Sequence, residues 1–157
     1  MAVGKPKKLI ELPRDYLIIM MEAGYVYLAM RRFQESLELF EGVCHLVPSS
    51  DVPRIAIGNV YAAQQKYDEA LKEYRKAIKL EPQSALAHAH MGEVFLLQEK
   101  KDKGLTYINK ALKLDPDGKT GDFAKALLNA VDKKVLPLSE LNLSAQTETD
   151  PTKKSKK

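Results

Sequence analysis

Apolar residues recur along this chain at intervals of three and four, the spacing of one face of a helix. Three such faces carry the sets Leu37, Phe40 and Cys44, then Leu71, Tyr74 and Ile78, then Leu105, Ile108 and Leu112. A proline follows each face, and proline cannot continue a helix. The pattern therefore predicts six helices in three pairs, roughly over residues 13–30 and 34–47, 52–65 and 68–80, and 85–99 and 102–114.

The three helix pairs repeat with a period of 34 residues. The columns in phase are Gly24, Gly58 and Gly92; Tyr27, Tyr61 and Phe95; Phe40, Tyr74 and Ile108; Val43, Ala77 and Ala111; and Pro48, Pro82 and Pro116. A glycine inside a helix costs about 1 kcal/mol relative to alanine, so each one needs a structural reason. We expect the glycines to let the second helix of a pair press closely against the first.

This arrangement resembles the tetratricopeptide repeat (TPR). The second unit shows the pattern as Arg54-x2-Ile57-Gly58-x2-Tyr61, followed by Ala70-x3-Tyr74 and Pro82. The resemblance covers about residues 17–118, although no tryptophan opens any unit and Lys101 and Gly104 weaken the third turn. It implies an all-α fold, a right-handed α-solenoid of three TPR helix pairs, with repeats at about 17–50, 51–84 and 85–118.

The segments outside the repeats have different predicted roles. Apolar residues on one face after Pro116, among them Phe123 and Leu127, predict a C-terminal capping helix at about 119–134, which completes a TPR domain over 13–134. An apolar extension at 135–143 would pack on the cap or lie in a groove, and 144–157 would be a disordered basic tail. Residues 1–12 form a basic N-terminal segment whose apolar Leu9–Leu12 raises homodimerisation as an expectation.

Charge and composition narrow the function further. The net charge is +4, but residues 1–8 carry +3 and residues 152–157 carry +4, so residues 9–151 stand at −3. Because the basic character lies in the ends, nucleic acid is an unlikely partner. A single cysteine excludes an intrachain disulfide, and no apolar run is long enough to span a bilayer. We expect a cytoplasmic protein.

No motif in the sequence predicts catalysis. Gly118-Lys119-Thr120 resembles the end of a phosphate-binding loop, but Lys113 stands where that motif needs glycine. His90 and Glu93 could share a helix face, yet two ligands do not make a zinc site. Cys44 next to His45 is expected to be a core residue beside a surface one. We predict a protein that is not an enzyme and has no metal and no cofactor.

Stacked TPRs line a concave surface with the first helix of each unit, so the resemblance implies a groove for a partner. A helical stripe through these helices predicts the groove residues Ile18, Met21, Tyr25 and Leu28; Val52, Ile55, Asn59 and Ala62; and Leu86, Ala89, Glu93 and Leu96. Nine of the twelve are aliphatic or methionine, and only Glu93 is charged. The alternative is that part of this stripe is simply core, particularly Leu28 and Leu96. An apolar groove suits an amphipathic helix or an extended apolar segment.

Two classes of TPR protein give contrasting expectations. Members that serve heat-shock chaperones clamp a C-terminal carboxylate with Lys, Arg and Asn, whereas these positions here read Met21, Tyr25, Ile55, Asn59, Ala89 and Glu93. The chain is more similar to the small TPR chaperones of bacterial type III secretion, which hold an export substrate such as a translocator or needle subunit. That resemblance implies a secreted client and allows a second co-chaperone. The alternative is a generic TPR scaffold or adaptor in a multiprotein complex.

Overall fold

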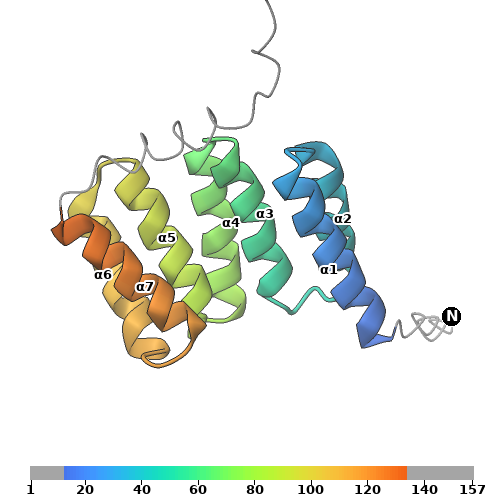
Figure 1. Cartoon of the computed structure of the whole chain (residues 1–157). Helices are drawn as coiled ribbons and strands as arrows, with labels where there is room; N and C mark the ends of the chain where they lie inside the picture. Colours follow the sequence, from blue (N-terminus) through green and yellow to red (C-terminus); the bar gives the residue numbers. More distant parts are fainter. Residues whose placement is uncertain (1–12, 134–157) are drawn as a thin grey trace, which may run out of the picture.

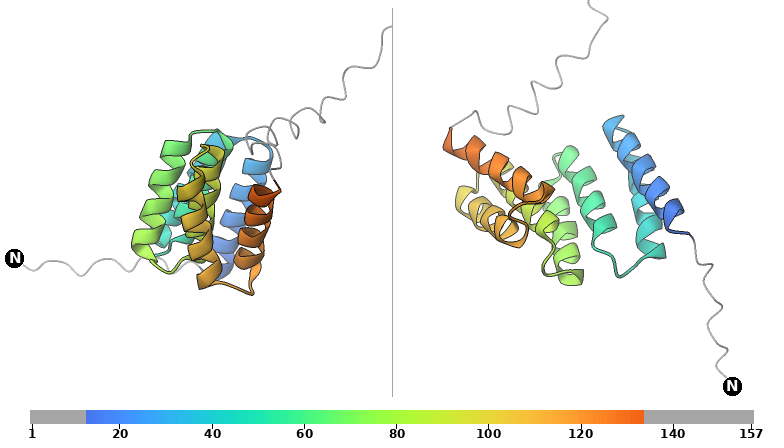
Figure 2. Two further views of the ribbon diagram at one scale, coloured as in Figure 1. Left: turned by 90° about the vertical axis from the view of Figure 1, so that its left-hand side faces the viewer. Right: turned by 60° about the horizontal axis from the view of Figure 1, so that its bottom comes forward.

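The computed structural model describes residues 13–133, which form seven helices and no strand (Figure 1). The helices are α1 (Arg14–Ala29), α2 (Phe33–Leu46), α3 (Val52–Ala63), α4 (Tyr67–Leu80), α5 (Ala85–Leu97), α6 (Lys101–Leu114) and α7 (Lys119–Asp132). They pack as consecutive antiparallel pairs that stack side by side, and α7 lies against the last pair (Figures 1 and 2). The predicted all-α architecture of three helix pairs and a capping helix is confirmed, with helix ends within two residues of expectation.

The assignments made for residues 1–12, 135–143 and 144–157 lie outside the described residues. Among residues 13–133, no helix combines the length and the apolar character needed to cross a bilayer.

Close approach explains the helical glycines. A Cβ atom added at Gly58 would lie 2.3 Å from the Tyr74 ring, and one at Gly24 would lie 2.4 Å from the Phe40 ring. Both rings are fully buried. The repeating glycine and the repeating large side chain therefore form the same contact in each of these pairs. In it, the large side chain of the second helix packs directly on the backbone of the first helix at the glycine.

The turn inside each pair also repeats. Arg31, Gln65 and Glu99 lie 34 residues apart and adopt the left-handed conformation, with φ of 59°, 59° and 60°. After each, a backbone N–H donates back to the carbonyl five residues earlier, as from Arg32 to Tyr27 at 2.8 Å. This is the helix-ending bond of a Schellman motif, which satisfies a carbonyl that the helix leaves unpaired.

Burial increases along the solenoid from α1 to α5. Gly24 is the single buried residue of α1, whereas eight residues of α5 are buried. One core cluster surrounds Phe40, a second surrounds Tyr74, and a third joins Ile108 to Leu127 of α7. The middle and C-terminal pairs thus form the best-packed part of the fold.

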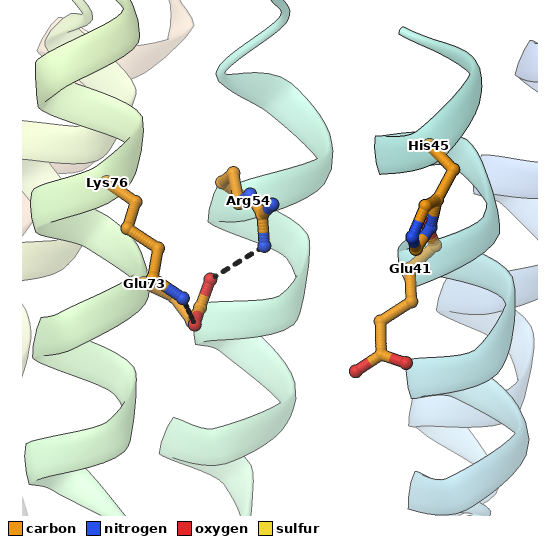
Figure 3. A network of polar contacts seen from close by, with 5 residues as sticks. All are labelled: Glu41, His45, Arg54, Glu73 and Lys76. Carbon is orange, nitrogen blue, oxygen red and sulfur yellow. Dashed lines mark hydrogen bonds and ion pairs between the residues drawn. The ribbon is translucent and has the colours of Figure 1, made fainter. Parts of the chain in front are cut away.

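A polar network ties α3 to α4 (Figure 3). The buried Glu73 carboxylate accepts hydrogen bonds from Arg54 at 3.4 Å and from Lys76 at 2.5 Å. On α2, the ring of His45 turns back along its own helix, with Nδ1 2.7 Å from the carbonyl oxygen of Glu41. The charges of Arg54, Glu73 and Lys76 balance one another through these hydrogen bonds, and the Arg54–Glu73 pair links α3 to α4.

Candidate protein-binding groove

An apolar pocket opens between the first and second helix pairs. Its volume is about 550 Å³, and it lies among the N-terminal half of α1, the C-terminal end of α2 and the start of α3. The predicted groove residues on its wall are Ile18, Met21, Tyr25 and Val52. Val43, Val47 and Pro53 complete the apolar surface, while Arg14 and Glu22 stand among the polar residues of the wall. The pocket exists because α1 packs on α2 through Gly24 but makes few contacts with α3.

A second, smaller pocket of about 230 Å³ lies between α3 and α5. It contains the predicted groove residues Asn59, Ala62 and Glu93, together with Tyr74 and His90. The Tyr74 hydroxyl donates to Oδ1 of Asn59 at 2.7 Å, and His90 Nδ1 lies 3.1 Å from the Glu93 carboxylate. The walls of this pocket are therefore more polar than those of the first.

Aromatic stacking holds the histidine of the second pocket in place. The His90 ring is stacked on Tyr74 at 5.8 Å between centroids and is tilted against Phe123 of α7 at 5.4 Å. Burial, reinforced by the charge of Glu93, raises the pKa of Tyr74 well above its usual value. Burial also raises the pKa of Tyr25. Both phenols are protonated at neutral pH, and the hydroxyl of Tyr74 is the one that donates, to Asn59.

Three of the predicted groove residues belong to the core instead. Ile55 is 1% exposed and packs in the middle cluster, while Ala89 and Leu96 pack in the C-terminal cluster with Leu127 of α7. The stripe treats each helix alone, whereas in the fold α7 and the neighbouring pair cover the faces that carry these three residues. Leu28 and Leu86 are half-buried and pack against core clusters, so they offer little surface to a partner.

Several pocket residues were not identified from the sequence. Val43 and Val47 come from the second helix of a pair, and Tyr74 reaches the groove from α4 through the gap left by Gly58. A stripe drawn only through the first helix of each unit misses all three.

Cys44 and His45 are neighbours in the sequence but have different surroundings in the fold. Cys44 is buried, and burial raises the pKa of its thiol, whereas His45 beside it is exposed. Within residues 13–133, no group of three or more His, Cys, Asp or Glu side chains could hold a metal ion.

Family models agree with the repeat period. A TPR repeat model matches residues 58–98, and a tetratricopeptide repeat model matches residues 85–117. Residues 58–117 are thus similar in sequence to tetratricopeptide repeats. No curated protein matches its sequence.

Solved TPR structures share the fold at low identity. The type III secretion translocator chaperone SycD of Yersinia enterocolitica is 16% identical, with a TM-score of 0.67, 80% of this chain covered and 99% of SycD. PcrH in complex with the chaperone-binding region of PopD is 18% identical, with a TM-score of 0.64 and coverages of 80% and 98%. The first TPR of Spaghetti (RPAP3), bound to the HSP90 peptide SRMEEVD, is 16% identical, with a TM-score of 0.63 and coverages of 80% and 98%. These TPR structures therefore support the architecture of the chain.

Proposed function

We propose that this TPR protein binds an apolar or amphipathic segment of a partner protein in its concave groove. The observation that carries the proposal is the apolar pocket of about 550 Å³ bounded by α1, α2 and α3. Its wall includes Ile18 and Val52, which are 54% and 47% exposed. An exposed apolar surface in a concave site is typical of a protein-binding groove, because covering it removes apolar area from water.

The composition of both pockets argues against a carboxylate clamp of the heat-shock type. Arg14 is the single cation on the wall of the first pocket, and the residues lining the second include no lysine or arginine. The second pocket instead presents the Glu93 carboxylate, which would repel a bound carboxylate. A peptide ending in a free carboxylate is thus a poor match, although the RPAP3 domain that binds one has the same fold.

We further propose that the partner is an export substrate and that the chain acts as a type III secretion chaperone. The similarity in fold to SycD and to PcrH, which is seen with the chaperone-binding regions of PopB and PopD, supports this reading. The mechanism would be passive: the groove covers the apolar segment of the client and prevents premature assembly until export. Met21 suits this role because a flexible thioether adapts to different apolar partners.

A generic scaffold remains the second candidate. The observation that favours it is an exposed apolar surface on α1 outside the groove, at Tyr16, Ile19, Val26 and Met30. A scaffold would engage partners through such an edge and leave the groove empty.

Capture from a lysate of the native host with two single variants separates these functions. Ile18→Glu places a charge on the pocket wall, and Ile19→Glu places the same charge on another side of the same helix at 59% exposure. We expect Ile18→Glu to reduce recovery of a small client with an amphipathic segment by about 10-fold or more, and Ile19→Glu to leave it unchanged. Mass spectrometry identifies the client.

The opposite pattern would contradict partner binding in the groove. Equal recovery with wild type and Ile18→Glu would assign partner binding to another surface and favour the scaffold. The carboxylate clamp has a separate test, in which labelled SRMEEVD peptide is titrated with the protein and anisotropy is measured. We expect no saturable binding, and micromolar affinity would overturn our reading of Glu93.

A further inference from the structure

The second pocket, between α3 and α5, differs in size and character from the apolar first pocket. Its volume is about 230 Å³, below the roughly 300 Å³ at which small-molecule sites begin, so it suits one long side chain rather than a separate ligand. Ala62, Ala63 and Leu97 supply apolar wall, and Glu93 supplies a carboxylate. A side chain with an apolar stem and a polar end matches such a wall.

The Glu93 carboxylate is open to a donor from outside the chain. Its side chain is 34% exposed, and among residues 13–133 its one hydrogen-bond partner is His90, whose Nδ1 lies 3.1 Å from Oε2. Stacking on Tyr74 and contact with Phe123 hold the His90 ring in this position. The residues that line the pocket include neither lysine nor arginine, so Oε1 is left for an incoming cation.

The ends of two helices add negative potential at the same place. α3 ends at Ala63 and α5 ends at Leu97, and both residues line the second pocket. The C-terminal end of a helix carries a partial negative charge that a nearby cation stabilises. The second helix of each pair carries its own basic residue in the last turn, at His45, Lys79 and Lys113. α3 and α5 carry none, so their ends lack the cation that the other helices supply for themselves.

We infer that the second pocket binds a lysine or arginine side chain of the same client segment whose apolar residues fill the first pocket. The methylene stem lies along Ala62, Ala63 and Leu97, and the charged group donates to the Glu93 carboxylate. Charge complementarity selects this occupant, because Glu93 and both helix ends would repel an anion. The inference rests on the proposed function, since it adds a specificity-determining site to the same groove.

The two pockets are close enough for one segment to reach both. Pro53 at the start of α3 lines the first pocket, and Asn59 and Ala62 of the same helix line the second. At 1.5 Å per residue, Pro53 is about 9 Å from Asn59 and about 14 Å from Ala62 along the helix axis. We therefore expect the basic residue about three to four positions from the apolar anchor in an extended segment, or about six to nine in a helical one.

Selection from a random peptide library tests the pocket without knowledge of the client. The full chain is immobilised, and the displayed peptides have about 16 residues, enough for about four helical turns. We expect the selected peptides to combine apolar residues with a lysine or arginine at the spacing given above. A selected lysine peptide is then compared with the same peptide carrying acetyl-lysine, which keeps the stem and removes the charge. Fluorescence anisotropy measures both affinities.

The variants assign the preference for a cation to Glu93. Wild type should bind the lysine peptide about 10-fold more tightly than the acetyl-lysine peptide, and Glu93→Gln should abolish this preference. The matched control Glu69→Gln removes an exposed carboxylate of α4 outside both pockets and should retain it. Added salt should weaken the preference, because the pair is partly exposed. Circular dichroism verifies that each variant is helical.

Failure of this inference and failure of the proposed function give different results. Selected apolar peptides that lose affinity with Ile18→Glu but show no preference for a basic residue would overturn the inference and leave the groove function intact. A preference for lysine that persists in Glu93→Gln would also overturn it, because the cation would then bind elsewhere. If no selected peptide depends on Ile18, both the groove function and the inference are overturned.

Discussion

The two ends of the solenoid present opposite surfaces to solvent. At the C-terminal end, α7 buries Ala124 and Leu127 against α5 and α6 and exposes Asp122 and Lys125. At the N-terminal end, α1 buries Gly24 alone and exposes the apolar side chains of Tyr16, Ile19, Val26 and Met30. Both helices are long and apolar enough to cover a neighbouring pair, but α7 has a polar outer face and therefore ends the array.

The comparison shows that amphipathicity decides what a terminal helix can do. A helix with one apolar face can bury that face against its own chain, and its polar outer face then ends the stack of helix pairs. A helix that is apolar in several directions satisfies one face on its own partner helix and leaves the others for a ligand or a second chain. α1 has three such directions: toward α2, toward the groove, and toward solvent, where Tyr16, Ile19, Val26 and Met30 lie exposed.

The largest expected effect contrasts a buried leucine of α7 with an exposed valine of α1. Leu127→Ala should lower the free energy of unfolding by about 3 kcal/mol, because the truncated side chain leaves a cavity in the C-terminal cluster. Val26→Ala should change it by less than about 0.5 kcal/mol in the monomer. Urea unfolding at low micromolar protein concentration measures both.

A similar loss of unfolding free energy in Leu127→Ala and Val26→Ala would contradict the contrast between the two ends of the solenoid. It would mean that the outer face of α1 is covered within the monomer. Leu80→Ala, at a 41% exposed leucine of α4, calibrates what loss of an exposed apolar side chain costs in this protein.

The second contrast uses the glycines of the first and third helix pairs. A Cβ atom at Gly92 would meet Ile108 at 2.5 Å and backbone atoms of Gly104 and Ile108 at 3.0 Å, whereas one at Gly24 would meet only ring atoms of Phe40. We expect Gly92→Ala to lower the free energy of unfolding by about 2 kcal/mol and Gly24→Ala to lower it by about 1 kcal/mol. The effect at Gly24 is smaller because α1 has few other neighbours and can move outward. Both values come from denaturant unfolding curves.

Gly42→Ala is the matched control for a helical glycine without a close neighbour. Its added Cβ would lie 3.4 Å from the end of the Met20 side chain, so the variant should gain up to about 1 kcal/mol from the higher helix propensity of alanine. If Gly24→Ala costs as much as Gly92→Ala, α1 is held as rigidly as α5, and the contrast between the two ends fails.

The fold was predictable from the sequence because its determinants are local and repeat. Apolar periodicity and the prolines located the helices, and the 34-residue phase of Gly58 and Tyr74 identified the contact inside each pair. The left-handed turns at Arg31, Gln65 and Glu99 were not predictable, since none of the three is a glycine. They follow from the geometry of the helix ends, which residue type alone does not reveal.

The groove was less predictable, because exposure depends on which helices cover a face. Ile18 and Val52 lie in the pocket as expected, but Ile55 is buried by the neighbouring pair and Ala89 by α7. The exposed apolar face of α1 was not predictable for a related reason. In the run from Ile18 to Met21 every residue is apolar, so no pattern separates the core side, the groove side and the outer side.

The smallest expected effect is a pH dependence confined to the C-terminal half of the solenoid. His88 of α5 is buried, and its equivalents in the first two repeats are Met20 and Arg54, which cannot titrate near neutral pH. Burial lowers the pKa of His88 below its usual value, and the charge of Lys110 adds to this effect. Nε2 lies 3.1 Å from the Pro82 carbonyl oxygen, whereas Nδ1 is buried without a partner among the described residues, so a second proton there would be unpaired.

The pKa of His88 is lower in the folded state than in the unfolded state, where it is about 6.5. The stability that the neutral side chain contributes is therefore complete above the unfolded pKa. It is lost as the pH falls through the folded pKa. The slope is at most about 1.4 kcal/mol per pH unit. His88→Gln should flatten urea unfolding midpoints between about pH 7 and 5, and His45→Gln, at an exposed histidine, should retain the wild-type slope. If the urea midpoint of His88→Gln depends on pH as steeply as that of wild type, the acid sensitivity arises elsewhere. The well-packed C-terminal half would then be no more sensitive to acid than the open N-terminal pair.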